Sequence, residues 1–278
     1  MVRRADPVGA PPGVIPIAAP DDPRVAEYRL IADPAALLRA GLFVVEGRLV
    51  LRRILLLPRF HIRSVLVTQT AFDALADALV QLDSRVPSYV VEPSVMNDLA
   101  GFQIHRGCLA LAERPRVPLI DEMNFEAARR LLVLEGVNNP DNVGGIFRSA
   151  AAFGVDAVIL GPGCGDPLYR KAIRTSMSGT LQVPFASAGQ WPDALTALRQ
   201  RGFHVLALTP ASDAGALEDV PRNLERVALL VGTEGHGLSA GALAAVQEKI
   251  RIRMPGAADS LNVTVAASIA LHHFGARE

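Results

Sequence analysis

The hydrophobic positions of residues 24–113 alternate between two spacings. Short apolar runs, typical of buried strands, occur at residues 42–45, 64–68, 89–91 and 108–112. The intervening stretches carry apolar residues at helical spacing, over residues 24–40, 46–57, 71–82 and 93–99. Strands that alternate with helices indicate a small sheet covered by helices. We therefore predict one α/β unit over residues 24–113.

A second alternating series fills the C-terminal half. Apolar strands are predicted at residues 131–134, 157–160, 205–208, 227–231 and 250–252. Helices are predicted at residues 143–153, 168–177, 192–201, 239–246 and 263–274. The strand–helix–strand order of the first three elements requires a right-handed crossover between parallel strands. The predicted fold class is therefore α/β, with a parallel sheet in residues 125–278.

Proline-rich segments mark the boundaries of these two units. Residues 7–20 hold five prolines, which interrupt the apolar run that an export signal needs, so we predict a flexible tail over residues 1–23. Residues 114–124 contain Pro115 and Pro118 and are predicted to be a linker. A length of 278 residues fits the resulting two domains, 24–113 and 125–278.

The charge of the chain excludes a generic polyanion binder. Lysine plus arginine and aspartate plus glutamate both total 28, so the formal net charge is zero. Residues 1–120 hold 14 basic and 12 acidic side chains, against 14 and 16 in residues 121–278. Arginines dominate residues 39–63, including Arg48, Arg52 and Arg53. A solvated helix face and a contact surface for an RNA backbone both remain open for this cluster.

The cysteines and histidines predict neither a disulfide nor a metal site. Cys108 and Cys164 form no CxxC pair, which favours a reducing, cytoplasmic setting. His272 and His273 have no third ligand at metal-binding spacing. No apolar run approaches the roughly 18 residues of a membrane span. We therefore expect no metal and no membrane partner.

One glycine-rich loop is typical of nucleotide sites but departs from their pattern. Gly161, Gly163 and Gly165 follow a buried strand, as in Rossmann-type enzymes. Such loops lead directly into a helix, whereas Pro162 stiffens this turn and residues 166–167 delay the next helix. We expect no cofactor here, and a Rossmann enzyme using this loop is kept as an alternative.

Residues 135–150 form the first motif that ordinary packing does not explain. Asn142 is predicted to cap the following helix, and Gly144 and Gly145 allow a close approach to its first turn. Arg148 follows within an apolar stretch, so it must be paired or face a ligand. A structural salt bridge remains one of these two interpretations.

Two further motifs follow later strands. Gly232, Gly235 and Gly237 surround Glu234 after a buried strand, and Ser239 is predicted to cap the next helix. No Lys-Ser/Thr pair follows, and Glu234 would repel a phosphate, so the loop favours a ligand with positive charge or hydrogen-bond donors. His236 is interpreted as a loop residue rather than a catalytic base.

The third motif spans residues 252–268, where a strand ends in Pro255 and Gly256 before an alanine-rich helix. Ser260 and Asn262 stand at the start of that helix. Helix capping explains one of these polar residues but hardly both, so a functional role is expected for this pair.

Together the three motifs resemble the SpoU (TrmH-like) family of RNA 2′-O-ribose methyltransferases, within the SPOUT superfamily. The resemblance rests on Asn139-Pro140-x-Asn142-x-Gly144-x-x-x-Arg148, on residues 232–239 and on residues 252–263. Residues 170–179 are similar to the family's Ser/Gly-rich segment. Residues 24–113, particularly 43–47 and 105–110, resemble the small ribosomal-protein-like RNA-binding domain often fused in front.

This resemblance implies a deep C-terminal trefoil knot, a homodimer and S-adenosylmethionine as cofactor. The family's cofactor-binding positions correspond to Thr209, Gly232, Ile252, Met254 and Leu261. Its catalytic positions correspond to Asn142, Arg148, Glu234, Ser260 and Asn262. Contacts with RNA are expected from Arg48, Arg52, Arg53 and Arg174.

The implied reaction is methylation of a ribose 2′-hydroxyl in structured RNA, with ribosomal RNA favoured over transfer RNA because of the front domain. Free guanidinium stays protonated, so our hypothesis is that Arg148 binds the target phosphate and polarises the hydroxyl. Glu234 would fix the cofactor loop or the arginine. The alternative is a non-catalytic RNA-binding or ribosome-assembly protein on the same fold.

Overall fold

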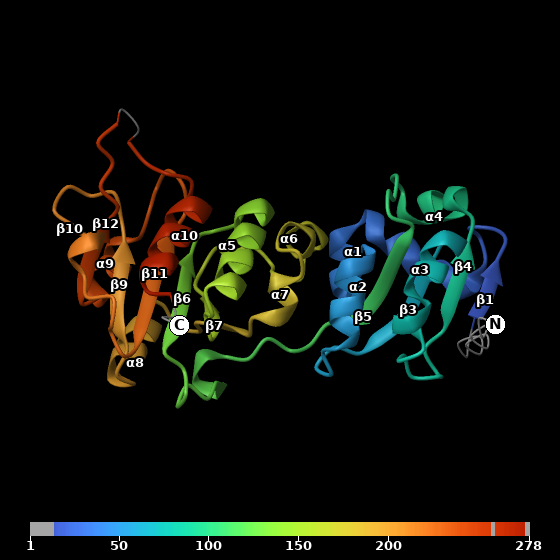
Figure 1. Cartoon of the computed structure of the whole chain (residues 1–278), viewed down its shortest axis with the longest axis horizontal. Helices are drawn as coiled ribbons and strands as arrows, with labels where there is room; N and C mark the ends of the chain where they lie inside the picture. Colours follow the sequence, from blue (N-terminus) through green and yellow to red (C-terminus); the bar gives the residue numbers. More distant parts are fainter. Residues whose placement is uncertain (1–13, 257–258, 276–278) are drawn as a thin grey trace, which may run out of the picture. The chain divides into compact units, whose positions relative to one another are not determined.

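The computed structural model describes residues 14–256 and 259–275, and the chain divides into two compact units, Met1–Pro115 and Arg116–Glu278 (Figure 1). Both units are α/β, which confirms the predicted class. In the described residues, no helix is long and apolar enough to cross a membrane, and no cluster of metal-ligating side chains occurs.

The first unit contains a five-stranded mixed sheet in the order β1-β4-β3-β5-β2. Its strands are β1 (Val14–Ile17), β2 (Leu42–Glu46), β3 (Ile62–Val67), β4 (Ser88–Val91) and β5 (Cys108–Glu113). Strand β5 runs antiparallel to both neighbours, whereas β1, β4 and β3 are mutually parallel. On β2, β3 and β5 consecutive apolar residues are buried, so both faces of the sheet are covered at these strands.

Helices cover both faces of this sheet. They are η1 (Pro23–Ala32, a 3-10 helix), α1 (Pro34–Arg39), α2 (Arg48–Leu55), α3 (Gln69–Leu79) and α4 (Pro93–Ala100). The single helix predicted over residues 24–40 is wrong, because it divides at Pro34, which has no backbone N–H. Asp33 caps α1 by accepting from the N–H groups of Ala35 and Ala36, at 2.9 and 3.1 Å.

Two predicted boundaries need correction. The predicted tail extends too far, because β1 pairs in parallel with β4; Pro16 is tolerated on this edge strand. Residues 1–13 lie outside the described residues. The predicted linker, residues 114–124, packs on the second unit in its latter part, where Ile120 is buried and Leu119 forms a bridge with Ser187.

The second unit contains a seven-stranded, wholly parallel sheet in the order β10-β12-β9-β11-β6-β7-β8. Its strands are β6 (Arg130–Glu135), β7 (Ala157–Leu160), β8 (Phe185–Ser187), β9 (His204–Leu208), β10 (Gly215–Ala216), β11 (Val227–Gly232) and β12 (Glu248–Arg251). The predicted βαβ unit is confirmed, since β6 and β7 are parallel neighbours. The short strands β8 and β10 were not predicted.

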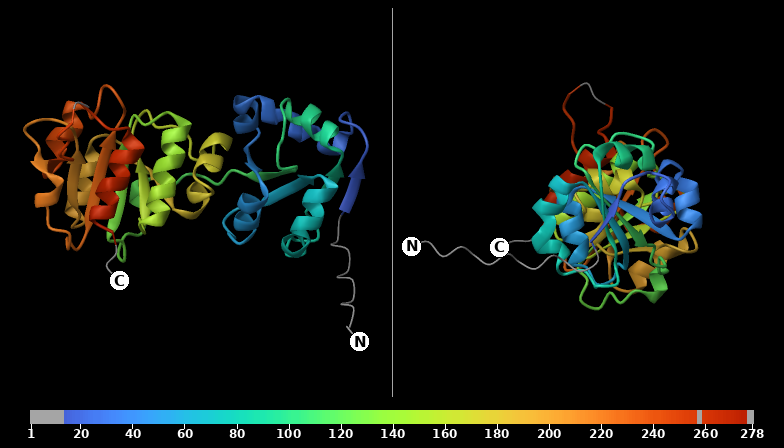
Figure 2. Two further views of the ribbon diagram at one scale, coloured as in Figure 1. Left: turned by 45° about the horizontal axis from the view of Figure 1, so that its top comes forward. Right: turned by 90° about the vertical axis from the view of Figure 1, so that its right-hand side faces the viewer.

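Helices bury both faces of the parallel sheet, which explains why its central strands are apolar throughout. They are η2 (Ile120–Glu122), α5 (Pro140–Ala152), α6 (Arg170–Thr175), α7 (Gly179–Gln182), α8 (Asp193–Gln200), η3 (Leu217–Asp219), α9 (Ala240–Ala245) and α10 (Val263–His273). On β6, Leu132 and Leu134 join the core cluster beneath α5 and α10, whereas Leu131 and Val133 join the cluster beneath α8 and α9. Helices α5 and α10 lie side by side (Figure 2).

Candidate functional site

A pocket of about 190 Å³ lies at the carboxyl ends of β9 and β11. Three separate segments line it: the residues after β9, the loop after β11 and the segment between β12 and α10. Ligand crevices of parallel α/β sheets form at this end of the strands. The pocket lining includes all five residues predicted for the cofactor: Thr209, Gly232, Ile252, Met254 and Leu261.

The loop after β11 is packed so tightly that Gly232 leaves no room for a side chain. A Cβ atom at this position would lie 2.7 Å from the carbonyl carbon of Gly237 and 2.9 Å from the Leu238 side chain. Thr233 and Gly237 form a bridge across the loop. The pocket loop, defined as residues 232–238, therefore turns back on itself and presents main-chain groups to the pocket.

The walls of the pocket combine apolar and polar groups. Leu208, Val231 and Val263 supply apolar surface, and Glu234 supplies an exposed carboxylate. Ser260, which the sequence placed at the start of the last helix, also lines the pocket and is exposed. Such a lining suits a ligand with an apolar body and a positive charge.

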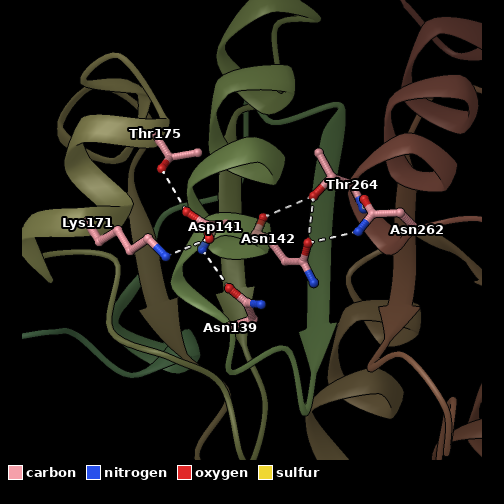
Figure 3. Close-up of polar contacts among 7 residues, drawn as sticks. All are labelled: Asn139, Asp141, Asn142, Lys171, Thr175, Asn262 and Thr264. Carbon is pink, nitrogen blue, oxygen red and sulfur yellow. Dashed lines mark hydrogen bonds and ion pairs between the residues drawn. The ribbon is translucent and has the colours of Figure 1, made fainter.

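Three predicted catalytic residues form one hydrogen-bond network beside the pocket. The Asn142 and Asn262 side-chain amides both donate to Oε1 of Glu234, at 3.2 and 2.5 Å. Nδ2 of Asn262 also donates to Oδ1 of Asn142 at 3.0 Å. Figure 3 shows Asn142 facing Asn262 and Thr264, whose hydroxyl donates to the Asn142 backbone oxygen at 3.3 Å. The network thus joins α5, the pocket loop and α10.

The cap of α5 differs from the prediction, and the caps of α5 and α10 explain how this network forms. Asn139, not Asn142, caps α5: its Oδ1 accepts from the Asp141 N–H at 2.9 Å, and Pro140 takes the first helical position. Asn142 is therefore inside the helix, with its side chain directed at Glu234. Asn262 caps α10: its Oδ1 accepts from the Thr264 N–H at 3.0 Å. Its Nδ2 is therefore free to donate to Asn142 in the network.

The first turn of α5 is held from both sides. Asp141 accepts from Nζ of Lys171 at 2.7 Å and from the Thr175 hydroxyl at 3.3 Å (Figure 3). The hydrogen bond from Lys171 lowers the pKa of Asp141 below its usual value. Gly144 lies so close to α6, and Gly145 to α10, that a Cβ would come within 2.7 and 2.6 Å of them. The close approach predicted for Gly144 and Gly145 is therefore made by the neighbouring helices α6 and α10.

Arg148 stands apart from the other predicted catalytic residues. It is exposed, and within the described residues it makes no ion pair, so the structure does not support the salt-bridge interpretation. Six residues beyond Asn142, it lies about 240° around α5 and roughly 9 Å along its axis. Arg174, on α6, is also exposed. The structure thus brings Asn142, Glu234 and Asn262 together but leaves Arg148 outside the network.

The arginines predicted to bind RNA in the first unit differ in their environments. Arg52 donates to both carboxylate oxygens of Asp77, at 2.6 and 2.8 Å, and to the backbone oxygen of Ala74 at 2.7 Å. Arg52 therefore fastens α2 to α3. Nε of Arg48 is buried without a hydrogen-bond partner in the described residues. Arg53 is half-buried and engaged in interactions.

The loop at residues 161–165 is shaped by packing. A Cβ on Gly161 would lie 2.7 Å from the Leu134 backbone oxygen, and one on Gly165 would lie 2.7 Å from that of Asn138. None of the three glycines lines the pocket. This placement favours the expectation that the loop binds no cofactor.

The three histidines His236, His272 and His273 differ in their surroundings: two pack against other parts of the second unit, and one is exposed. His273 is buried, and its Nε2 lies 2.9 Å from the Val220 backbone oxygen, while the His272 ring packs on Phe153. His236 is exposed on the pocket loop.

Sequence reasoning missed one buried polar group, the carboxylate of Glu135, which contacts Trp191 and Ser239. Its only signal was a charged residue that ends an apolar strand.

Comparison with known proteins gives consistent matches. The SpoU rRNA Methylase family matches residues 129–272. The chain is 40% identical, over 93% of both chains, to an uncharacterized tRNA/rRNA methyltransferase of Mycobacterium tuberculosis. It is 28% identical to the 23S rRNA (guanosine(2553)-2′-O)-methyltransferase RlmP of Bacillus subtilis, over 71% of this chain and 79% of that protein. An AdoMet-bound rRNA methyltransferase from Sinorhizobium meliloti shares the fold, with a TM-score of 0.79 at 23% identity over 94% of this chain and 97% of that one.

Proposed function

Because the chain belongs to the SpoU rRNA Methylase family of RNA methyltransferases, we propose that it methylates a ribose 2′-hydroxyl of structured RNA, using S-adenosylmethionine. Ribosomal RNA is favoured over transfer RNA as the substrate, and the reaction is placed in the cytoplasm. The observation that carries this proposal is the pocket beside the Asn142–Glu234–Asn262 network. The 2′-O-methyltransferase activity in the name of the B. subtilis relative supports the same chemistry.

The residues of the pocket fit S-adenosylmethionine. Leu208, Ile252 and Leu261 offer apolar surface for an adenosine, and the tight turn at Gly232 offers main-chain donors and acceptors. Glu234 contributes a carboxylate to the pocket, which would suit a molecule that carries a positive charge. Bound there, the cofactor would supply a methyl group on a positively charged sulfur. Thr209 and Met254 would complete its binding site.

The chain's own residues would orient the hydroxyl that accepts the methyl group. Orientation of two reactants in line can contribute about 7–11 kcal/mol to a barrier reduction. Glu234 fixes the pocket loop to α5 and α10, because its Oε1 accepts from two asparagine amides. We assign Asn142, Asn262 and the exposed Ser260 to orienting the ribose. Arg148 would bind the adjoining phosphate and polarise the hydroxyl.

Arg148 would reach a pocket across a homodimer. Helix α10 exposes Val265 and Ile269, 46% and 39% accessible and one helical turn apart, beside the α5 surface. Exposed apolar side chains at this spacing are typical of a helix face that packs on a partner. We therefore propose that a second copy packs on this face and that Arg148 of one subunit acts at the pocket of the other.

The remaining features follow the family pattern. We assign a deep trefoil knot to the second unit, as membership of the family implies. The first unit is proposed as a ribosomal-protein-like RNA-binding domain. Arg48 and Arg53 there, with Arg174 in the second unit, are assigned to RNA contacts. Arg52 would contribute least, since Asp77 already engages it.

The experiment that tests the proposal is a map of 2′-O-methyl sites in RNA from cells with and without this gene. The expected result is one ribose in ribosomal RNA that loses its methyl group with the gene and regains it with the cloned gene. An identical map in both strains would overturn the proposal and leave the non-catalytic RNA-binding alternative.

A further inference from the structure

Glu135 ends β6 with a carboxylate that is buried, its residue being only 7% accessible. Three donors satisfy it. Nε1 of Trp191 and the Ser239 hydroxyl donate to Oε1, at 2.7 and 2.6 Å, and the Ser239 backbone N–H donates to Oε2 at 2.9 Å. A buried carboxylate is costly unless it is hydrogen-bonded in this way. Glu135 does not line the pocket, and the proposed reaction does not use it.

Ser239 is the point where the pocket loop ends. Leu238, directly before it, lines the pocket, and Ser239 itself caps α9 by accepting from the Ala242 N–H at 3.2 Å. At the other end of the loop, Gly232 is paired in register with Glu135 across β11 and β6. One residue therefore contacts both ends of the pocket loop: the backbone of Glu135 pairs with Gly232, and its carboxylate accepts from Ser239. Glu234, in its middle, is held separately by Asn142 and Asn262.

The third donor comes from a different part of the fold. Trp191 precedes α8, and its ring lies 3.2 Å from the position that a Cβ on Gly161 would occupy. Glu135 thereby ties the exit of the pocket loop to a packed aromatic side chain. The loop end is fixed to the sheet, not merely to its own helix.

We propose that Glu135 is a positioning residue for the cofactor pocket: it holds Ser239, and through it Leu238 and Gly237, in the geometry that binds the cofactor. This inference rests on the proposed use of S-adenosylmethionine. It predicts that substitution of Glu135 weakens cofactor binding, although Glu135 itself does not line the pocket.

The hydrogen-bond pattern requires a carboxylate and not merely a polar side chain. Glutamine has the same shape but only one acceptor oxygen. In Glu135→Gln, the amide nitrogen must face either the Ser239 N–H or the pair formed by the Trp191 N–H and the Ser239 hydroxyl. In either orientation at least one of the three donors faces the amide nitrogen instead of an acceptor oxygen, which displaces the loop end.

The test is calorimetric titration of S-adenosylmethionine into the full chain and into Glu135→Gln, with Glu46→Gln as a matched control. Glu46 is also a buried glutamate at a strand end, but it belongs to the first unit. We expect Kd to rise roughly tenfold in Glu135→Gln, the effect of losing one buried hydrogen bond, and to stay unchanged in Glu46→Gln. In methyl-transfer assays, KM for the cofactor should rise while kcat is retained.

The outcomes are distinguishable. A wild-type chain that binds no S-adenosylmethionine overturns the proposed function. A wild-type chain that binds it with the same Kd as Glu135→Gln overturns only the role of Glu135, even if the variant unfolds at a lower temperature. If Glu135→Gln does not fold, Trp191→Phe removes only the Nε1 donor to Glu135 and leaves the Ser239 cap of α9 in place. A several-fold rise in Kd then supports the proposal, and an unchanged Kd overturns it.

Discussion

Two glycine-rich loops follow buried parallel strands in the second unit, one after β7 and one after β11. Both contain three glycines, and the loop at residues 161–165 is nearer to the usual nucleotide-binding pattern. Gly161 and Gly165 press against backbone oxygens of Leu134 and Asn138, whereas Gly232 lets the pocket loop fold back and line a cavity. Glycine spacing alone therefore does not identify a ligand site. The two loops differ in what their glycines contact: another backbone segment in the first loop, and the same loop in the second, which lines the pocket.

The largest expected effect is on kcat, in a variant that should impair methyl transfer while the pocket loop still binds the cofactor. Arg148→Ala should lower kcat by about 10²- to 10³-fold, because a charged group that stabilises the reacting oxygen is removed. The Kd for S-adenosylmethionine should stay within about twofold, since Arg148 does not line the pocket. Single-turnover kinetics and calorimetry measure the two quantities. A comparable loss of cofactor affinity would contradict this role.

The second prediction tests the pocket loop itself. Gly232→Ala places a Cβ 2.7 Å from the Gly237 carbonyl carbon, so the loop must open. We expect Kd for S-adenosylmethionine to rise by about 100-fold, equivalent to roughly 3 kcal/mol, as measured by calorimetry. Circular dichroism should show a folded chain. Wild-type affinity in this variant would show that the pocket loop does not bind the cofactor.

The third prediction tests the other loop. Gly163 has a φ of 72°, and an added Cβ would meet nothing closer than 3.4 Å. Gly163→Ala should therefore cost about 1 kcal/mol of unfolding free energy through backbone strain, measured by denaturant titration. Cofactor affinity should not change. A loss of binding here, with Gly232→Ala still binding, would favour the Rossmann alternative.

The smallest effect contrasts two arginines on α2. Arg48→Ala should flatten the dependence of RNA affinity on salt by slightly less than one unit of log–log slope, as about one phosphate contact is lost. Arg52→Ala should leave the slope unchanged, because Arg52 is engaged by Asp77. Filter binding at several salt concentrations measures both. If wild type and Arg48→Ala give equal slopes, the arginine cluster of α2 is a solvated helix face and not an RNA-binding surface.

Long apolar runs predicted the parallel pairing of the central βαβ unit. The residues that line the pocket were predicted only through the family resemblance of the three motifs. The sequence patterns missed β8 and β10, which are three and two residues long, too short for a periodic signal. The predicted cap for α5 was wrong, although Pro140 at the first helical position pointed to Asn139. The contacts of Glu135 were not predictable, since Trp191 and Ser239 lie 56 and 104 residues away. By contrast, the six-residue spacing of Asn142 and Arg148 could have predicted that Arg148 lies outside the network, because it separates the two by about 240° around one helix.

The most direct test of the proposed chemistry is to incubate the purified chain with methyl-labelled S-adenosylmethionine and ribosomal RNA, then digest the RNA to nucleosides and identify the labelled product. The account predicts a single 2′-O-methylated nucleoside, absent with Arg148→Ala. A label on a base, or no label from a chain that binds the cofactor, would contradict it.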